Sequence, residues 1–110
     1  MTEKILGKKY ELSLVFVGET RMKSLNKKYR KKNSATDILA FPISETSGEI
    51  FINQNVARKK AEQFSLTKNQ YIAYVFIHGL LHLKGYDHGR TMERLEDTWC
   101  RKFGVQTPTR

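Results

Sequence analysis

The chain has 110 residues, of which 39% are hydrophobic, so it is long enough for one compact domain with a small core. It has a formal net charge of +9, no apolar run of the roughly 18 residues that span a bilayer, and one cysteine, Cys100. A membrane-spanning protein and an internal disulfide are therefore excluded. Because the N-terminus also lacks a signal-peptide core, we expect a cytoplasmic protein with one domain over residues 1–110.

The positive charge is concentrated in two segments. Seven lysine and arginine residues lie between Arg21 and Lys32, and three more follow at 58–60. Each cluster alone fits either a solvated helix face or a surface that binds a polyanion. For the chain as a whole, the charge favours polyanion binding.

The first half of the chain alternates between strand and helix patterns. Residues 9–17 alternate as a strand does, with a predicted buried face of Tyr10, Leu12, Leu14 and Phe16. Residues 18–30 have helical spacing, which predicts an amphipathic helix with its basic side outward and an inward face of Met22, Leu25, Asn26 and Tyr29.

Two further strands are predicted beyond a polar loop at 31–36. The first covers 37–41 and should end at Pro42, which has no amide hydrogen for a sheet. A turn then leads to the second, at 49–53. The order of strand, helix, strand and strand, followed by helices, predicts an α/β fold in which helices pack on a small mixed sheet.

The second half of the chain has the pattern of three helices. Asn53 or Asn55 would cap the first, and Thr67 with Gln70 fits a capping box that opens a strongly apolar helix up to residue 83. Gly85 is a natural end for that helix. A last helix over 91–103 aligns Met92, Leu95, Trp99 and Phe103, and Gly104 would end it.

All three histidines of the chain lie in one segment, HGLLHLKGYDH, residues 78–88. His78 and His82 are four residues apart, so a helix presents both imidazoles on one face. Gly85 allows the chain to turn back, so that His88 can approach the same point. A lone histidine on an apolar helix is usually a core residue, but three in this spacing favour one zinc ion with a position open for water.

The residue after the first histidine counts against the usual zinc protease. Such enzymes read H-E-x-x-H, with the glutamate as general base, whereas this chain has Gly79. The glycine serves either close packing against a neighbouring element or space for a substrate beside the metal. Asp87 either accepts a hydrogen bond from a ligand's outer nitrogen or fixes the turn, and we favour the structural role.

This histidine segment resembles the signature H-G-x-L-H-L-x-G-Y-D-H of the YbeY family of bacterial rRNA maturation factors. LNKKYR, TDILAFP and GEIFI are similar to further segments of that family, in the same order. Ala40 and Glu49 depart from it, since serine and aspartate are usual there. We also expect the chain to lack the N-terminal helical segment that longer members carry before the first strand. The resemblance covers about Glu11 to Gly104.

The resemblance implies a zinc-dependent endoribonuclease that selects single-stranded RNA and acts in rRNA maturation and ribosome quality control. It implies His78, His82 and His88 as metal ligands, Arg30 as a residue that engages RNA, and a positively charged groove beside the site. Implied partners are rRNA and the small ribosomal subunit or its assembly factors. Three imidazoles would also accept nickel, copper or iron.

Two other functions stay open. Because no general base is assigned, the protein is alternatively a ribosome-assembly factor that binds RNA and holds a mainly structural zinc ion. A metal-dependent peptide hydrolase is the third hypothesis, and both Gly79 and the charge of +9 count against it.

Overall fold

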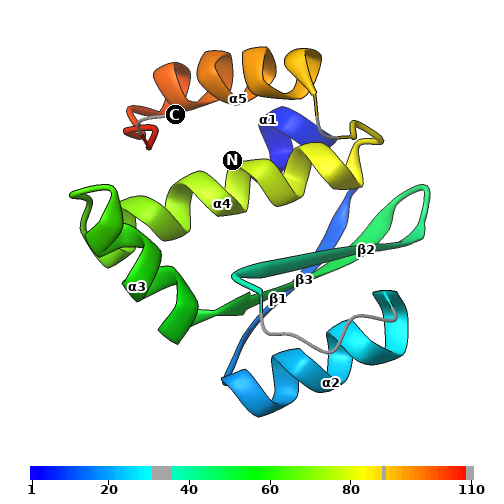
Figure 1. Cartoon of the computed structure of the whole chain (residues 1–110). Helices are drawn as coiled ribbons and strands as arrows, with labels where there is room; N and C mark the ends of the chain where they lie inside the picture. Colours follow the sequence, from blue (N-terminus) through cyan, green and yellow to red (C-terminus); the bar gives the residue numbers. More distant parts are fainter. Residues whose placement is uncertain (31–35, 88, 109–110) are drawn as a thin grey trace.

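The computed structural model describes residues 1–30, 36–87 and 89–108, and the side chains of Tyr29 and Arg30 lie outside the described part. The elements follow in the order α1 (Thr2–Leu6), β1 (Glu11–Val17), α2 (Glu19–Arg30), β2 (Ile38–Ser44), β3 (Ser47–Asn53), α3 (Gln54–Gln63), α4 (Lys68–Leu83) and α5 (Arg90–Phe103). The predicted α/β fold with a small mixed sheet is confirmed (Figure 1).

The central strand of the sheet is β3, because the strand order is β1-β3-β2. It runs parallel to β1 and antiparallel to β2. Its side chains alternate between two cores: Ile50 and Ile52 pack on the side of α4, and Phe51 packs with Met22 and Leu25 of α2. Helix α4 therefore covers one face of the sheet and α2 the other, while α5 lies on the outer side of α4 (Figure 1).

The predicted buried face of the first strand is confirmed only in part. Tyr10 and Leu12 are partly buried, and Leu12 packs against the core on the side of α4. Leu14 is 41% exposed and Phe16 is 47% exposed. The reason is the position of β1 at an edge of the sheet, since the helices pack mainly on β2 and β3. The short helix α1 corrects the expectation that no helical segment precedes the first strand. One turn is too short for a periodic pattern, and burial of Ile5 next to α4 stabilises it.

The predicted end of the second strand at Pro42 is also wrong. Strand β2 continues to Ser44, with Pro42 opposite Gly48 and a register shift between Pro42 and Ser44. Because β2 is the other edge of the sheet, one side of it has no partner strand among the described residues, and a missing amide hydrogen is tolerated there.

Local sequence signals locate the helix ends correctly. The Asn53 side chain accepts hydrogen bonds from two backbone amides at the start of α3, and Thr67 and Gln70 form the capping box of α4. Gly85 has φ 110° and Gly104 has φ 68°, backbone values that favour glycine. Helix α2 buries Met22, Leu25 and Asn26 as predicted. No helix in the described ranges is both long and apolar enough to cross a membrane.

Gly79 lies where α4 packs closely on the sheet. A Cβ atom there would meet Cδ1 of Ile38 at 2.8 Å and Cδ1 of Ile50 at 3.1 Å. Close packing therefore explains the glycine, and the same residue also lines the pocket described below.

We expect Gly79→Ala to change the free energy of unfolding by less than about 1 kcal/mol. The two isoleucine ends can shift, and alanine favours a helix by about 0.5–1 kcal/mol over glycine. Gly79→Val should destabilise the fold by about 1–3 kcal/mol, because a branched side chain overfills this contact. Urea denaturation compares the two variants; an unchanged midpoint for Gly79→Val would contradict the packing explanation.

Candidate active site

Helix α4 presents His78 and His82 side by side. Their Nε2 atoms are 3.0 Å apart, and the rings lie nearly perpendicular, with centroids 4.6 Å apart and an angle of 78° between their planes. The spacing of four residues places both imidazoles on one face of the helix. Two nitrogen atoms thus converge on one point at the wall of a pocket.

This pair has a geometry that suits a shared cation. In a tetrahedral zinc site, two nitrogen ligands at about 2.0–2.1 Å from the metal lie about 3.3 Å from each other. The observed 3.0 Å, at which the two nitrogen atoms share a hydrogen bond in the metal-free protein, is about 0.3 Å shorter than that value. His88 lies outside the described residues, and among the described ones no group of three or more His, Cys, Asp or Glu side chains is arranged to hold a metal. The zinc site with three histidines stays a prediction.

The outer nitrogen of His78 is bound by a carboxylate that the sequence did not single out. Glu96 of α5 contacts His78 Nδ1 through Oε1, and its Oε2 accepts a hydrogen bond of 3.1 Å from the Tyr74 hydroxyl. Glu96 follows Met92 by four residues and precedes Cys100 by four, and all three are buried. The sequence therefore contained a signal for this residue, because Glu96 is a carboxylate at the spacing of the buried, apolar residues of α5.

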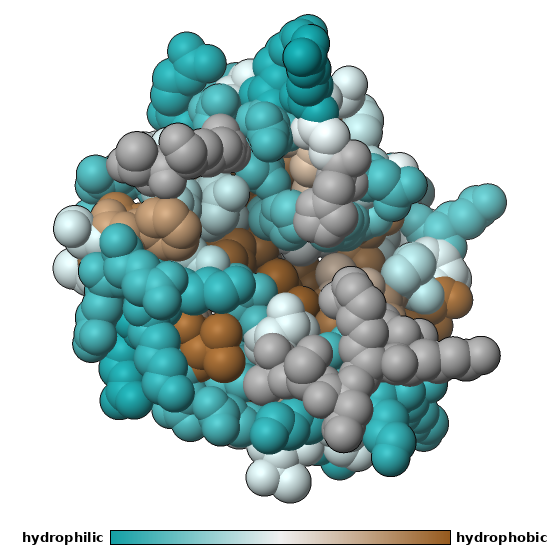
Figure 2. All heavy atoms as spheres, viewed as in Figure 1, coloured by the Kyte–Doolittle hydropathy of each residue, from teal (hydrophilic) through white to brown (hydrophobic). Residues whose placement is uncertain are grey.

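The pocket has a volume of about 540 Å³ and lies between α4 and β2. Hydrophobic side chains are recessed there in the centre of the face that Figure 2 shows, with hydrophilic side chains around them. The lining combines the histidine pair with residues 38–41 of β2 and with polar groups, namely Thr36, Asp37, Tyr71, Tyr74 and Asp87. Such a mixture of apolar walls and a few polar groups is typical of a ligand site.

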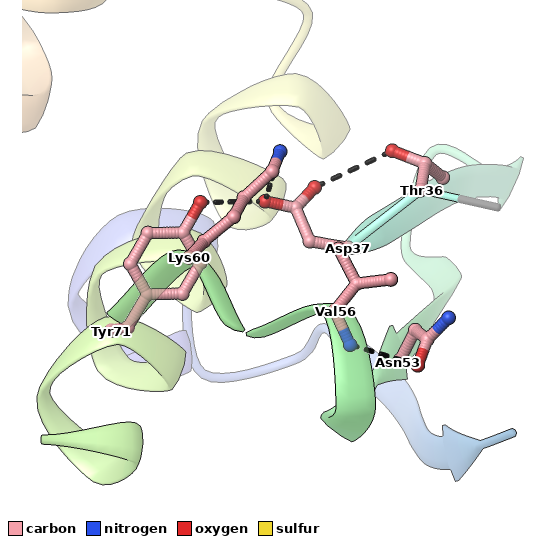
Figure 3. Close-up of polar contacts among 6 residues, drawn as sticks. All are labelled: Thr36, Asp37, Asn53, Val56, Lys60 and Tyr71. Atoms are coloured by element: carbon pink, nitrogen blue, oxygen red, sulfur yellow. Dashed lines mark hydrogen bonds and ion pairs between the residues drawn. The ribbon is translucent and has the colours of Figure 1, made fainter. Parts of the chain in front are cut away.

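A second carboxylate, Asp37, forms a polar cluster in the pocket wall (Figure 3). Its Oδ2 accepts hydrogen bonds from the Tyr71 hydroxyl at 2.7 Å and from Lys60 Nζ at 3.2 Å. Its Oδ1 accepts one from Thr36 at 3.4 Å. Burial, and next to it the negative charge of Asp37, raise the pKa of Tyr71 well above its usual value, so this phenol stays protonated and donates.

The remaining predicted residues are placed as follows. Asp87 is exposed at the pocket, and it is Glu96 that binds the outer nitrogen of His78. Arg30 is the last residue of α2, and its side chain lies outside the described part of the chain.

The basic side chains of α2 lie on the sheet face away from α4. Arg21, Lys23 and Lys27 are exposed there. The pocket reaches towards that face, because its lining includes Leu39 and Phe41, which pack in the α2 core.

Fold and pocket together define a class: small α/β proteins in which a central helix presents two imidazoles beside the edge of a mixed sheet. The family model described as Endoribonuclease YbeY matches residues 1–104, and the chain belongs to this family. The family suggested by the histidine segment is thus confirmed.

Individual relatives agree with this assignment. Endoribonuclease YbeY of Thermodesulfovibrio yellowstonii is 44% identical over 98 residues, which cover 77% of this chain and 62% of the relative. Endoribonuclease YbeY of Thermosipho melanesiensis is 36% identical, with 96% of this chain and 85% of the relative covered. The chain thus spans less than two thirds of the length of the first relative.

One solved structure shows the same fold. The solution structure of TM1509 from Thermotoga maritima has a TM-score of 0.65 and 28% identity to this chain. The match covers 91% of this chain and 74% of that protein.

Proposed function

We propose that this protein is a zinc-dependent endoribonuclease that cleaves single-stranded RNA during rRNA maturation. The observation that carries the proposal is the pair of Nε2 atoms, 3.0 Å apart, at the wall of a pocket in a member of an endoribonuclease family. His78, His82 and His88 would hold the ion. The same proposal includes a role in ribosome quality control and a location in the cytoplasm. It also includes contacts with the small ribosomal subunit or its assembly factors.

A zinc ion held by these residues would supply Lewis acidity, which polarises a phosphoryl oxygen and lowers the pKa of water. The chain's own residues bind and orient the substrate. Arg30 would make a bidentate hydrogen-bonded contact with a phosphate and stabilise the negative charge that develops there. The exposed basic side chains of α2 would supply much of the affinity for the RNA backbone.

The shape of the pocket supports selection of single-stranded RNA. A volume of about 540 Å³ fits a base that has left its stack, but not a duplex. Ile38, Ala40 and Phe41, which are all partly exposed, give the pocket an apolar lining on the side of β2. An unpaired base would bury its ring against them and bring its neighbouring phosphate to the imidazoles.

A second candidate is a ribosome-assembly factor that binds RNA and in which zinc is structural. The observation in its favour is Gly79, which packs against the sheet where a zinc protease carries its general base.

Removal of metal tests the proposal. We expect protein stripped with a chelator to lose at least about 100-fold of its cleavage rate on a single-stranded RNA, and one equivalent of zinc to restore it. The same RNA in a duplex should be cleaved far more slowly. Metal content is followed by elemental analysis of the same samples.

The results separate the two candidates. Full cleavage by metal-free protein would contradict a zinc-dependent nuclease. Zinc bound at one ion per chain, with RNA binding but no cleavage, would favour the assembly factor instead.

A further inference from the structure

Glu96 is a carboxylate in an apolar place. Its side chain is only 3% exposed, and it stands between the buried residues Met92 and Cys100 on α5. Removing a carboxylate from water costs several kcal/mol unless it gains hydrogen bonds or a charged partner. A leucine at this position would have no such desolvation cost, so the presence of a glutamate requires an explanation.

Both oxygen atoms of Glu96 have a partner on α4. Oε1 contacts His78 Nδ1, and Oε2 accepts from the Tyr74 hydroxyl at 3.1 Å. These two contacts are one helical turn apart, so they fix the plane of the carboxylate and, through it, the His78 ring. The two partners lie 18 and 22 residues before Glu96 in the chain, so the contacts join two separate helices.

The chemistry of these contacts sets the proton on the imidazole. When Glu96 is ionised, its carboxylate only accepts hydrogen bonds, which places the hydrogen of this contact on His78 Nδ1. In the neutral ring, Nε2 then carries a lone pair, which accepts a hydrogen bond from His82 Nε2 in the metal-free protein and would bind a metal in its place. That atom points at His82 Nε2, 3.0 Å away, where the two rings converge.

We propose that Glu96 is a positioning residue, which holds His78 in the tautomer that directs the Nε2 electron pair into the pocket. The inference deepens the proposed function, because the same electron pair is the one that would bind the metal. Tyr74 has a supporting role, since its hydroxyl holds the second carboxylate oxygen in place. Removing a group that hydrogen-bonds to a metal-binding histidine typically lowers metal affinity 10- to 100-fold.

The test compares three variants of the full chain. Glu96→Gln keeps the shape and one acceptor but loses the charge, and Glu96→Leu loses the acceptor. Glu93→Gln is the matched control, because Glu93 is exposed on the same helix and undergoes the same chemical change. Circular dichroism first establishes that each variant is folded.

Zinc affinity is measured by competition with a coloured chelator. We expect about a 10-fold loss for Glu96→Gln, up to about 100-fold for Glu96→Leu, and none for Glu93→Gln. In metal-free protein, nitrogen NMR should show the His78 ring protonated at Nδ1 in the wild type and in Glu96→Gln. Glu96→Leu should show a mixture of the two tautomers.

Affinity of folded Glu96→Gln within twofold of wild type would overturn the proposal, as would a wild-type His78 protonated mainly at Nε2. If Glu96→Leu does not fold, Glu96→Gln alone decides the affinity. If the wild type binds no zinc, the proposed function is wrong. The tautomer of His78 in the metal-free protein then still tests whether Glu96 positions the His78 ring.

Discussion

Replacing His82 with alanine is expected to lower the rate of RNA cleavage at least about 100-fold while the protein stays folded. The variant removes one of the two nitrogen atoms that converge at the pocket wall. His82 is only partly buried, and alanine is the best helix former, so the helix should tolerate the change. The rate is measured on a fluorescent single-stranded RNA, and the fold by circular dichroism.

RNA binding should survive the same substitution. The exposed basic side chains of α2 lie on the other face of the sheet and are untouched, so we expect the dissociation constant to change less than about threefold. Lys84→Ala is a matched control, because Lys84 is exposed directly after the same helix. Equal cleavage by wild type and His82→Ala would show that the activity belongs to a contaminant or to another site, and would leave the binding role intact.

The parts of the site that were predictable are local in sequence. His78 and His82 share a helix face because four residues make about one turn, and this holds in any fold. Asn53 and Thr67 cap helices through backbone groups two or three residues away. Gly85 ends α4 through its own backbone angle.

The parts that were missed depend on contacts between distant segments. Asp37 meets Lys60 and Tyr71 across 23 and 34 residues, and Glu96 meets His78 across 18. No pattern within one helix or strand reports which carboxylate will face another element. In the same way, exposure of Leu14 and continuation of β2 through Pro42 follow from strand order, which places β1 and β2 at the edges.

Because Asp37 joins elements that are distant in sequence, its removal should have a large effect on stability. We expect Asp37→Ala to lower the free energy of unfolding by about 2–4 kcal/mol. The Tyr71 hydroxyl, which donates to Asp37 at 2.7 Å, would be left buried without its acceptor. An unsatisfied buried donor costs about 1–3 kcal/mol, and the lost packing of the side chain adds to this.

Lys60 should contribute much less than Tyr71 to this effect. Its side chain is 42% exposed, so water replaces the lost partner, and an ion pair of this kind is worth at most about 1 kcal/mol. Lys60→Met keeps the apolar stem and removes the charge, which makes it the matched control; we expect it to cost less than about 1 kcal/mol. Urea denaturation at neutral pH measures both variants. If the two substitutions cost the same, the ion pair rather than the buried phenol would be the main contact of Asp37. If neither costs more than about 0.5 kcal/mol, the cluster does not stabilise the fold, and Asp37 would be retained for the pocket that it lines.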